Sequence, residues 1–266
     1  MFRSASFLFI ATLFSGTAFG QVSQLDQIQI APPMRQVQPP SPTASAEELE
    51  KQGDDLRGQK SYLDAIDYFH AALAKSPNKP SIVNKIGISE LMLQRYRDAG
   101  RSFDRAIKID RKFAEAYNNL GVVDYEKHKY GTAVKQYKKA IALSPDSASF
   151  YSNLGAAYFA AKKFEQASEA YSKAVELDPT IFEHTSHTGI AAQMASPEDR
   201  AHYDFVLAKL YAKMGDSDHS LEYLRKAMED GYKKVDEALT DPEFADLRKD
   251  ARFAELMKAK PQAIPE

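Results

Sequence analysis

The sequence predicts an all-α fold, a right-handed α-solenoid of stacked antiparallel helix hairpins. Two observations lead to this prediction. The chain repeats itself every 34 residues between Ala46 and Ile181, and each repeat holds two segments with apolar residues at helical spacing. A period of this length is typical of solenoids, because one hairpin cannot bury its apolar faces alone and has to stack on its neighbours.

The four repeat units cover residues 46–79, 80–113, 114–147 and 148–181. Glycine occupies the eighth position of each unit: Gly53, Gly87, Gly121 and Gly155. Alanine occupies the twentieth and twenty-seventh positions: Ala65, Ala99, Ala133 and Ala167, then Ala72, Ala106, Ala140 and Ala174. An aromatic residue occupies the twenty-fourth: Phe69, Phe103, Tyr137 and Tyr171. We expect the small residues to let two helices approach closely and the aromatic ring to fill the space beside them.

Proline at position 32 prevents the second helix of a unit from continuing, as at Pro77, Pro145 and Pro179. The whole pattern resembles the tetratricopeptide repeat (TPR) family. The departures are Arg111 in place of the proline, and Leu49 and Val83 in place of the large aromatic at position 4. The resemblance implies a non-catalytic fold that binds other proteins.

The beginning of the chain has the layout of a signal peptide over residues 1–20. Arg3 is followed by a short apolar run and by small residues before a plausible cleavage site at Gln21. The alternative is a retained N-terminal anchor. The chain has no cysteine and therefore no site for lipid attachment at that residue. We expect an extracytoplasmic protein, periplasmic or secreted, without membrane insertion after cleavage.

The remaining segments are predicted from composition and from weaker repeat signals. Residues 21–45 are rich in Pro and Gln and are expected to be a disordered linker. Ser45 and Glu48 have the spacing of a capping box at the start of the first helix. Residues 182–200 are an insertion, 201–234 fit a degenerate fifth unit, and 235–266 are expected to form a capping segment and tail. That ending resembles the tail of many bacterial TPR proteins.

Composition and motifs indicate no catalytic chemistry. The net charge of −2 gives no indication of nucleic acid binding, and the absence of cysteine excludes thiolate metal sites and a cysteine nucleophile. No phosphate-binding loop, nucleophile elbow or zinc-protease motif is present. Glu183, His184 and His187 form the nearest approach to a metal site, but zinc needs a third protein ligand beside the two histidines, and the sequence gives no clear indication of one. We expect no enzyme, cofactor or metal.

A second line of residues follows the first helices at spacings that place them on one helix face. The resemblance implies that this face lines a concave groove that holds another protein or an extended peptide segment. The predicted groove residues are Asn84, Ile88, Asn118, Asn119, Val122, Tyr125, Ser152, Asn153, Ala156 and Phe159. The alternative is that these residues serve only the packing of neighbouring helices. A groove that clamps a terminal carboxylate is disfavoured, because Glu50 and Asp54 would repel it.

The predicted function is an exported scaffold for protein–protein interaction, in cell-envelope or secretion assembly. Two other functions remain open from the sequence. One is a metal-binding or enzymatic protein that uses the insertion at 182–200. The other is a self-assembling structural solenoid, since stacks with incompletely capped ends can join head to tail.

Overall fold

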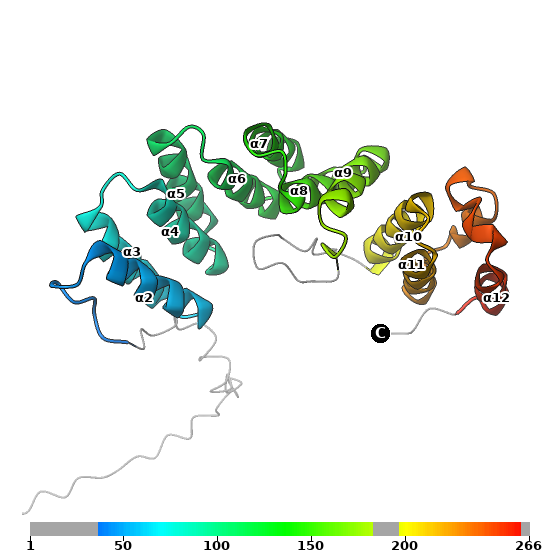
Figure 1. The fold of residues 1–266 in the computed structure, drawn as a ribbon, viewed down its shortest axis with the longest axis horizontal. Coiled ribbons are helices and arrows are strands. Elements are labelled where there is room, and N and C mark those ends of the chain that lie inside the picture. The colour runs from blue at the N-terminus through cyan, green and yellow to red at the C-terminus, as the bar shows by residue number, and fades with distance from the viewer. Residues whose placement is uncertain (1–36, 183–196, 262–266) are drawn as a thin grey trace, which may run out of the picture. The chain divides into compact units, whose positions relative to one another are not determined.

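The computed structural model describes residues 37–182 and 197–261. Four helix pairs follow one another: α2 (Ala46–Gly58) with α3 (Tyr62–Lys75), α4 (Pro80–Met92) with α5 (Tyr96–Ile109), α6 (Ala114–Glu126) with α7 (Tyr130–Leu143), and α8 (Ala148–Ala160) with α9 (Phe164–Leu177) (Figure 1). They are followed by α10 (Pro197–Met214), α11 (Ser217–Glu229), the short 3₁₀ helices η1 (Val235–Leu239), η2 (Pro242–Phe244) and η3 (Leu247–Lys249), and α12 (Ala251–Ala259). The described residues contain no strand, which confirms the all-α prediction. The predicted signal peptide and the candidate metal residues Glu183, His184 and His187 lie outside these residues.

The start of the helical array is defined by hydrogen bonds at Ser45. Its hydroxyl accepts from the Glu48 backbone N–H at 3.2 Å, and its own N–H donates to the Glu48 carboxylate at 2.8 Å. The predicted capping box is therefore present. The described end of the predicted linker is attached to α3, because Tyr68 and Lys75 donate to the backbone carbonyls of Gln38 and Pro42.

The two helices of each pair approach closely at the glycine of the first and the aromatic ring of the second. A Cβ built on Gly121 would lie 2.7 Å from Cε1 of Tyr137, and the other three units repeat this contact. The alanines at positions 20 and 27 are fully buried in all four units, and the four rings are at most 1% exposed. The sequence prediction of a tight hairpin around these positions is confirmed.

The turn between the two helices needs one residue in the left-handed region. Four non-glycine residues adopt it at the fifteenth position of their units, with φ between 57° and 63°: Lys60, Gln94, His128 and Lys162. At Gln94 the turn closes with the Arg95 N–H bonded to the Glu90 carbonyl at 2.8 Å, the hydrogen-bond pattern that ends many helices. Gly215 occupies the corresponding place between α10 and α11 with φ 79°.

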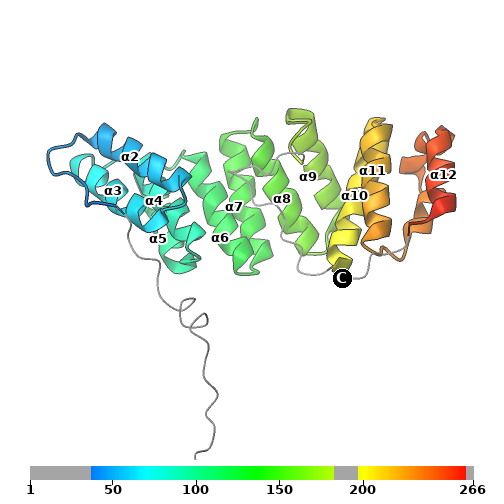
Figure 2. The ribbon, with the colours of Figure 1, turned by 90° about the horizontal axis from the view of Figure 1, so that it is seen from below.

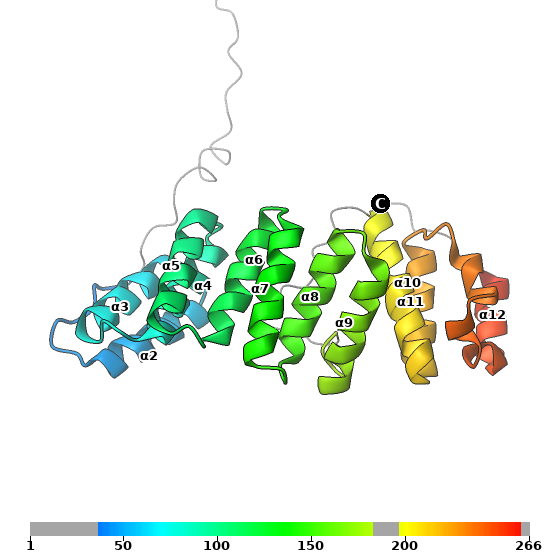
Figure 3. The ribbon, with the colours of Figure 1, turned by 90° about the horizontal axis from the view of Figure 1, so that it is seen from above.

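The pairs stack in chain order, with each second helix packed on the next first helix (Figures 2 and 3). First helices also touch one another directly, α4 on α6 and α6 on α8. Among the described residues the buried side chains form one large cluster from α6 to α12 and a second one over the first two pairs, and two small clusters lie between these pairs and α6 and among α6, α7 and α8. The first helices therefore make one continuous layer, which is the layer that carries the predicted groove residues.

The fifth pair, α10 and α11, joins the stack with its first helix reversed relative to the first helices of the regular units. The rings of Phe164 and His202 lie 4.1 Å apart, and Lys162 Nζ lies 2.8 Å from Asp199 Oδ1, so the start of α10 is beside the start of α9. In the regular units the next first helix begins near the end of the preceding second helix, as Ala148 does after Leu143. Helix α10 also begins at Pro197, inside the stretch predicted as an insertion.

The hairpin of α10 and α11 keeps the close approach of the regular units. Ser220 Oγ donates to the Ala208 carbonyl at 2.7 Å, which joins the two small positions of this pair. Beyond it, η2, η3 and α12 cover the last apolar face. Four apolar residues of the predicted capping segment are buried: Phe244, Leu247, Phe253 and Leu256.

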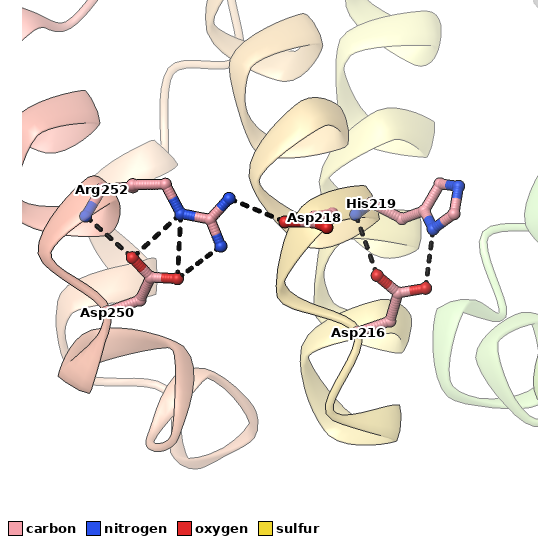
Figure 4. A network of polar contacts seen from close by, with 5 residues as sticks. All are labelled: Asp216, Asp218, His219, Asp250 and Arg252. Atoms are coloured by element: carbon pink, nitrogen blue, oxygen red, sulfur yellow. Dashed lines mark hydrogen bonds and ion pairs between the residues drawn. The ribbon is translucent and has the colours of Figure 1, made fainter.

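Ionic contacts at the surface connect the cap to α11 (Figure 4). Arg252 on α12 donates to Asp218 on α11 at 2.7 Å and to Asp250 at 2.7 Å. Nearby, Asp216 accepts from the His219 backbone and side chain at the start of α11. Such exposed pairs contribute little individually, so the buried apolar residues hold the cap in place.

The glycine–aromatic contact predicts an unusual response to a conservative substitution. Gly121→Ala should destabilise the fold by about 1–3 kcal/mol, because the new methyl group overlaps the Tyr137 ring. Gly100→Ala is the matched control, since its Cβ would lie 3.8 Å from the nearest atom and helix propensity favours alanine by ~1 kcal/mol. Urea unfolding followed by circular dichroism measures both. Equal effects at the two positions would contradict this account.

Candidate functional site

The predicted groove residues lie on α4, α6 and α8, and the asparagines among them face the neighbouring first helix. Only three of the ten are partly exposed: Ile88, Asn119 and Ser152. The other seven are buried, each at most 9% exposed: Asn84, Asn118, Val122, Tyr125, Asn153, Ala156 and Phe159. This burial differs from the open surface that the sequence predicted for them, because neighbouring first helices touch along this line. That the face binds a peptide stays a prediction.

The asparagines of this line bond to one another across the helices. Asn119 Nδ2 donates to Asn84 Oδ1 at 3.0 Å, and Asn153 Nδ2 donates to Asn118 Oδ1 at 2.9 Å. Asn118 in turn donates to Asn119 Oδ1 at 3.2 Å. We call these four residues the asparagine ladder. Each inter-helix bond joins the sixth position of one unit to the fifth position of the unit before it.

The same two positions carry an ion pair at the first junction. Lys85 Nζ, at the sixth position, lies 2.7 Å from Glu50 Oε1 at the fifth position of the unit before it, and 2.5 Å from Asp54 Oδ2. Lys79 Nζ lies 2.8 Å from the other oxygen of Glu50. Partial burial opposes ionisation of Glu50, but the two lysines outweigh it and lower its pKa. At all three junctions between the first helices of the regular units, the sixth position of one unit therefore bonds to the fifth position of the unit before it. The first junction uses an ion pair, and the other two use amide hydrogen bonds.

A cleft lies between α9, α10 and the segment after α11, and sequence reasoning did not find it. Two adjoining cavities of about 330 and 660 Å³ share Phe164, His202, Tyr232 and Glu237 in their walls. The only sequence signal for this place is the break in the repeat at residues 182–200, since no residue in the cleft belongs to a recognisable motif. Within the described part of the chain, no group of three His, Asp or Glu side chains is arranged to hold a metal ion.

One buried carboxyl group stands apart from these networks. Asp204 on α10 is 8% exposed and makes no hydrogen bond or ion pair among the described residues. Burial, with the nearby carboxylate of Asp230, raises its pKa from 3.8 to about 7. Asp230 itself is held by Arg200 at 2.7 Å.

Comparisons with known proteins agree on one family. Family models described as TPR repeat or tetratricopeptide repeat match residues 50–114, 123–161, 148–181 and 205–229. A search of curated proteins finds no match.

Solved structures of similar fold are known. MamA from Desulfovibrio magneticus RS-1 is 22% identical, with a TM-score of 0.50 over 76% of this chain and 99% of that one. A thermophilic TPR protein of Thermus thermophilus is 21% identical, with a TM-score of 0.50 over 80% of this chain and all of that one. At these identities the likeness concerns the fold alone.

The asparagine ladder predicts coupling between neighbouring units. Asn84→Ala and Asn119→Ala should each cost about 1–3 kcal/mol of stability, because each leaves an amide of the other residue without its partner. In a double-mutant cycle the two effects should overlap by at least about 0.5 kcal/mol. The pair Asn84→Ala and Ser220→Ala is the control and should be additive, because the bond of Ser220 to the Ala208 carbonyl lies outside the ladder. Additivity in both pairs would show that the ladder does not couple the units.

The raised pKa of Asp204 leads us to predict that stability falls as the pH rises. Its folded pKa of about 7 lies above the ordinary value of 3.8, so the folded state binds a proton more tightly. Stability is therefore lost as the pH rises from about 4 to about 7, by up to about 1.4 kcal/mol per pH unit. Asp204→Asn removes this loss, and its advantage over the wild type should grow across that range and then level off. Denaturation curves that differ by a constant amount from pH 4 to pH 8 would contradict the assignment.

Proposed function

The chain belongs to the tetratricopeptide repeat family, and from this premise we propose that it is an exported, non-catalytic scaffold acting in cell-envelope or secretion assembly. Proteins with this fold generally serve protein–protein interaction. The observation that supports a scaffold most directly is the layer of first helices α2, α4, α6 and α8, in which side-chain bonds join each helix to the next. A rigid layer of this kind can present exposed side chains from several units to one partner.

Fewer residues of this layer are exposed to a partner than the sequence predicted. Ile88, Asn119 and Ser152 are partly exposed and come from three successive units, and Glu115 on α6 is exposed. Asn119 already donates to Asn84 and accepts from Asn118, so its amide has one donor and one acceptor position left. We propose that a partner contacts the edges of these residues as an extended segment or a complementary surface.

Export is proposed from the signal-peptide layout of residues 1–20. No helix in residues 37–182 and 197–261 combines the length and apolar character needed to cross a bilayer. Expression of the full chain in a bacterial host, fractionation of the cells and N-terminal sequencing test the proposal. A mature protein that begins at Gln21 outside the cytoplasm is expected, whereas a full-length cytoplasmic protein would contradict it.

Photo-crosslinking tests the binding face. A photoreactive amino acid at Glu115 should yield an adduct with a partner protein in cells, and the same amino acid at Lys135, which is exposed on the second helix α7, is the matched control. Mass spectrometry identifies the adduct. Equal yields of the same adducts from both positions would contradict a binding role for the first helices, and an adduct with a second copy of the chain would instead indicate self-assembly.

A further inference from the structure

The cleft beside α10 has an aromatic floor. The His202 ring lies 4.1 Å from the Phe164 ring and 5.4 Å from the Tyr232 ring, on which it stacks. Phe205 lies beneath Tyr232 with ring centroids 4.4 Å apart. Phe164, His202 and Tyr232 are only partly buried, so their remaining surface faces the cleft. A partly solvated aromatic surface in a concave site is a common place for ligand contact.

The rim of the smaller cavity carries an excess of negative charge. Four carboxylates and two ammonium groups line it: Glu165, Glu169, Glu237 and Glu243, then Lys209 and Lys213. Both lysines are already engaged, since Lys209 lies 2.7 Å from Asp241 and 3.1 Å from Glu243, and Lys213 lies 3.9 Å from Glu243. The lysines therefore do not neutralise the carboxylates of α9.

Glu165 and Glu169 are the uncompensated pair. They lie four residues apart on α9, where like charges repel, and both are exposed. Neither makes a hydrogen bond or an ion pair with any described residue. A cation placed between them would remove this repulsion.

The aromatic floor is neutral at physiological pH. Burial, together with the charges of Lys162 and Lys234, lowers the pKa of His202, although Asp199 and Glu237 act in the opposite direction. Burial, with the carboxylate of Glu237, raises the pKa of Tyr232 to about 12. A neutral imidazole between two rings does not repel a cation, and the ring faces attract one.

We propose that this cleft binds a basic side chain, lysine or arginine, presented by a partner protein. The aliphatic stem lies on Phe164, His202 and Tyr232, and the charged end reaches Glu165 and Glu169. Arginine fits both parts, because its planar guanidinium stacks on rings and bonds to carboxylates. The proposal rests on the proposed function only in taking the ligand to be part of a protein. The cleft adjoins the first-helix face at Phe159, whose ring lies 5.2 Å from that of Phe164, but Glu115 and Asn119 of that face do not line it.

An anionic ligand is disfavoured by the same charges. The larger cavity has three lysines, Lys162, Lys233 and Lys234, but Glu198, Asp199 and Glu237 line it as well. Lys162 is paired with Asp199 at 2.8 Å, and Lys234 lies 3.7 Å from Glu237. No excess of positive charge is left there to recognise phosphate or a carboxylate.

Titration of the full protein with small probes tests the site without a known partner. The probes are Nα-acetyl-arginine amide, Nα-acetyl-lysine amide, the neutral isostere Nα-acetyl-citrulline amide, and inorganic phosphate. Magnetic resonance follows the ring signals of His202, Phe164 and Tyr232. We expect saturable shifts of these signals with the two cationic probes and none with citrulline amide or phosphate.

Charge variants identify the residues responsible. Glu165→Gln with Glu169→Gln should weaken binding of the arginine probe roughly tenfold while leaving the fold intact, because both side chains are exposed. Glu47→Gln with Asp104→Asn changes the net charge equally at exposed sites on α2 and α5, away from the cleft, and should leave binding unchanged.

Three results would overturn the proposal: no saturable shift with either cationic probe, equal shifts with the citrulline probe, or unchanged binding in the Glu165/Glu169 variant. None of them bears on the crosslinking test of the first-helix face. The two proposals can therefore fail independently.

Discussion

The contact between the glycine of each first helix and the aromatic ring of each second helix is the constraint on which the rest of the structure depends. Because there is no room for a Cβ at Gly53, Gly87, Gly121 or Gly155, the two helices approach closely at the same position in all four units. Units of equal thickness and equal length stack with a constant offset. Two positions that meet at one junction then meet again at the next, so a bond made at one junction can recur along the stack.

The junctions between first helices use this constant offset for polar bonds. Lys85 reaches Glu50, Asn119 reaches Asn84, and Asn153 reaches Asn118, always from the sixth position to the fifth of the preceding unit. An amide that is buried needs its partner, so a slip of one residue would leave unsatisfied groups in the core. The ladder therefore specifies the register of the stack, while the apolar residues around it provide most of the favourable free energy.

The sequence predicted those features that depend on one unit alone. The helix pairs, the buried alanines at positions 20 and 27, the capping box at Ser45 and the four buried residues of the cap follow from spacing and residue size. The asparagines were harder to interpret, because exposure at Asn118 and Asn153 depends on how closely the neighbouring unit approaches. The direction of α10 was not predictable either. The pattern from Ala201 to Lys234 fits a fifth unit equally well whether its first helix runs in the regular or in the reversed direction.

The reversed entry of α10 explains why the cleft lies where it does. At a regular junction the second helix packs along the next first helix, and the repeat positions fill the space between them. At the α9–α10 junction the start of one helix lies beside the start of the other, so two residues of the fourth unit meet residues from outside the four regular units: Phe164 contacts His202, and Lys162 pairs with Asp199. The packing of the regular units does not determine the size or the lining of the cleft that these side chains leave between them. A recognition site at this junction can therefore change its residues without disturbing the glycine–aromatic contacts that hold the four regular units together.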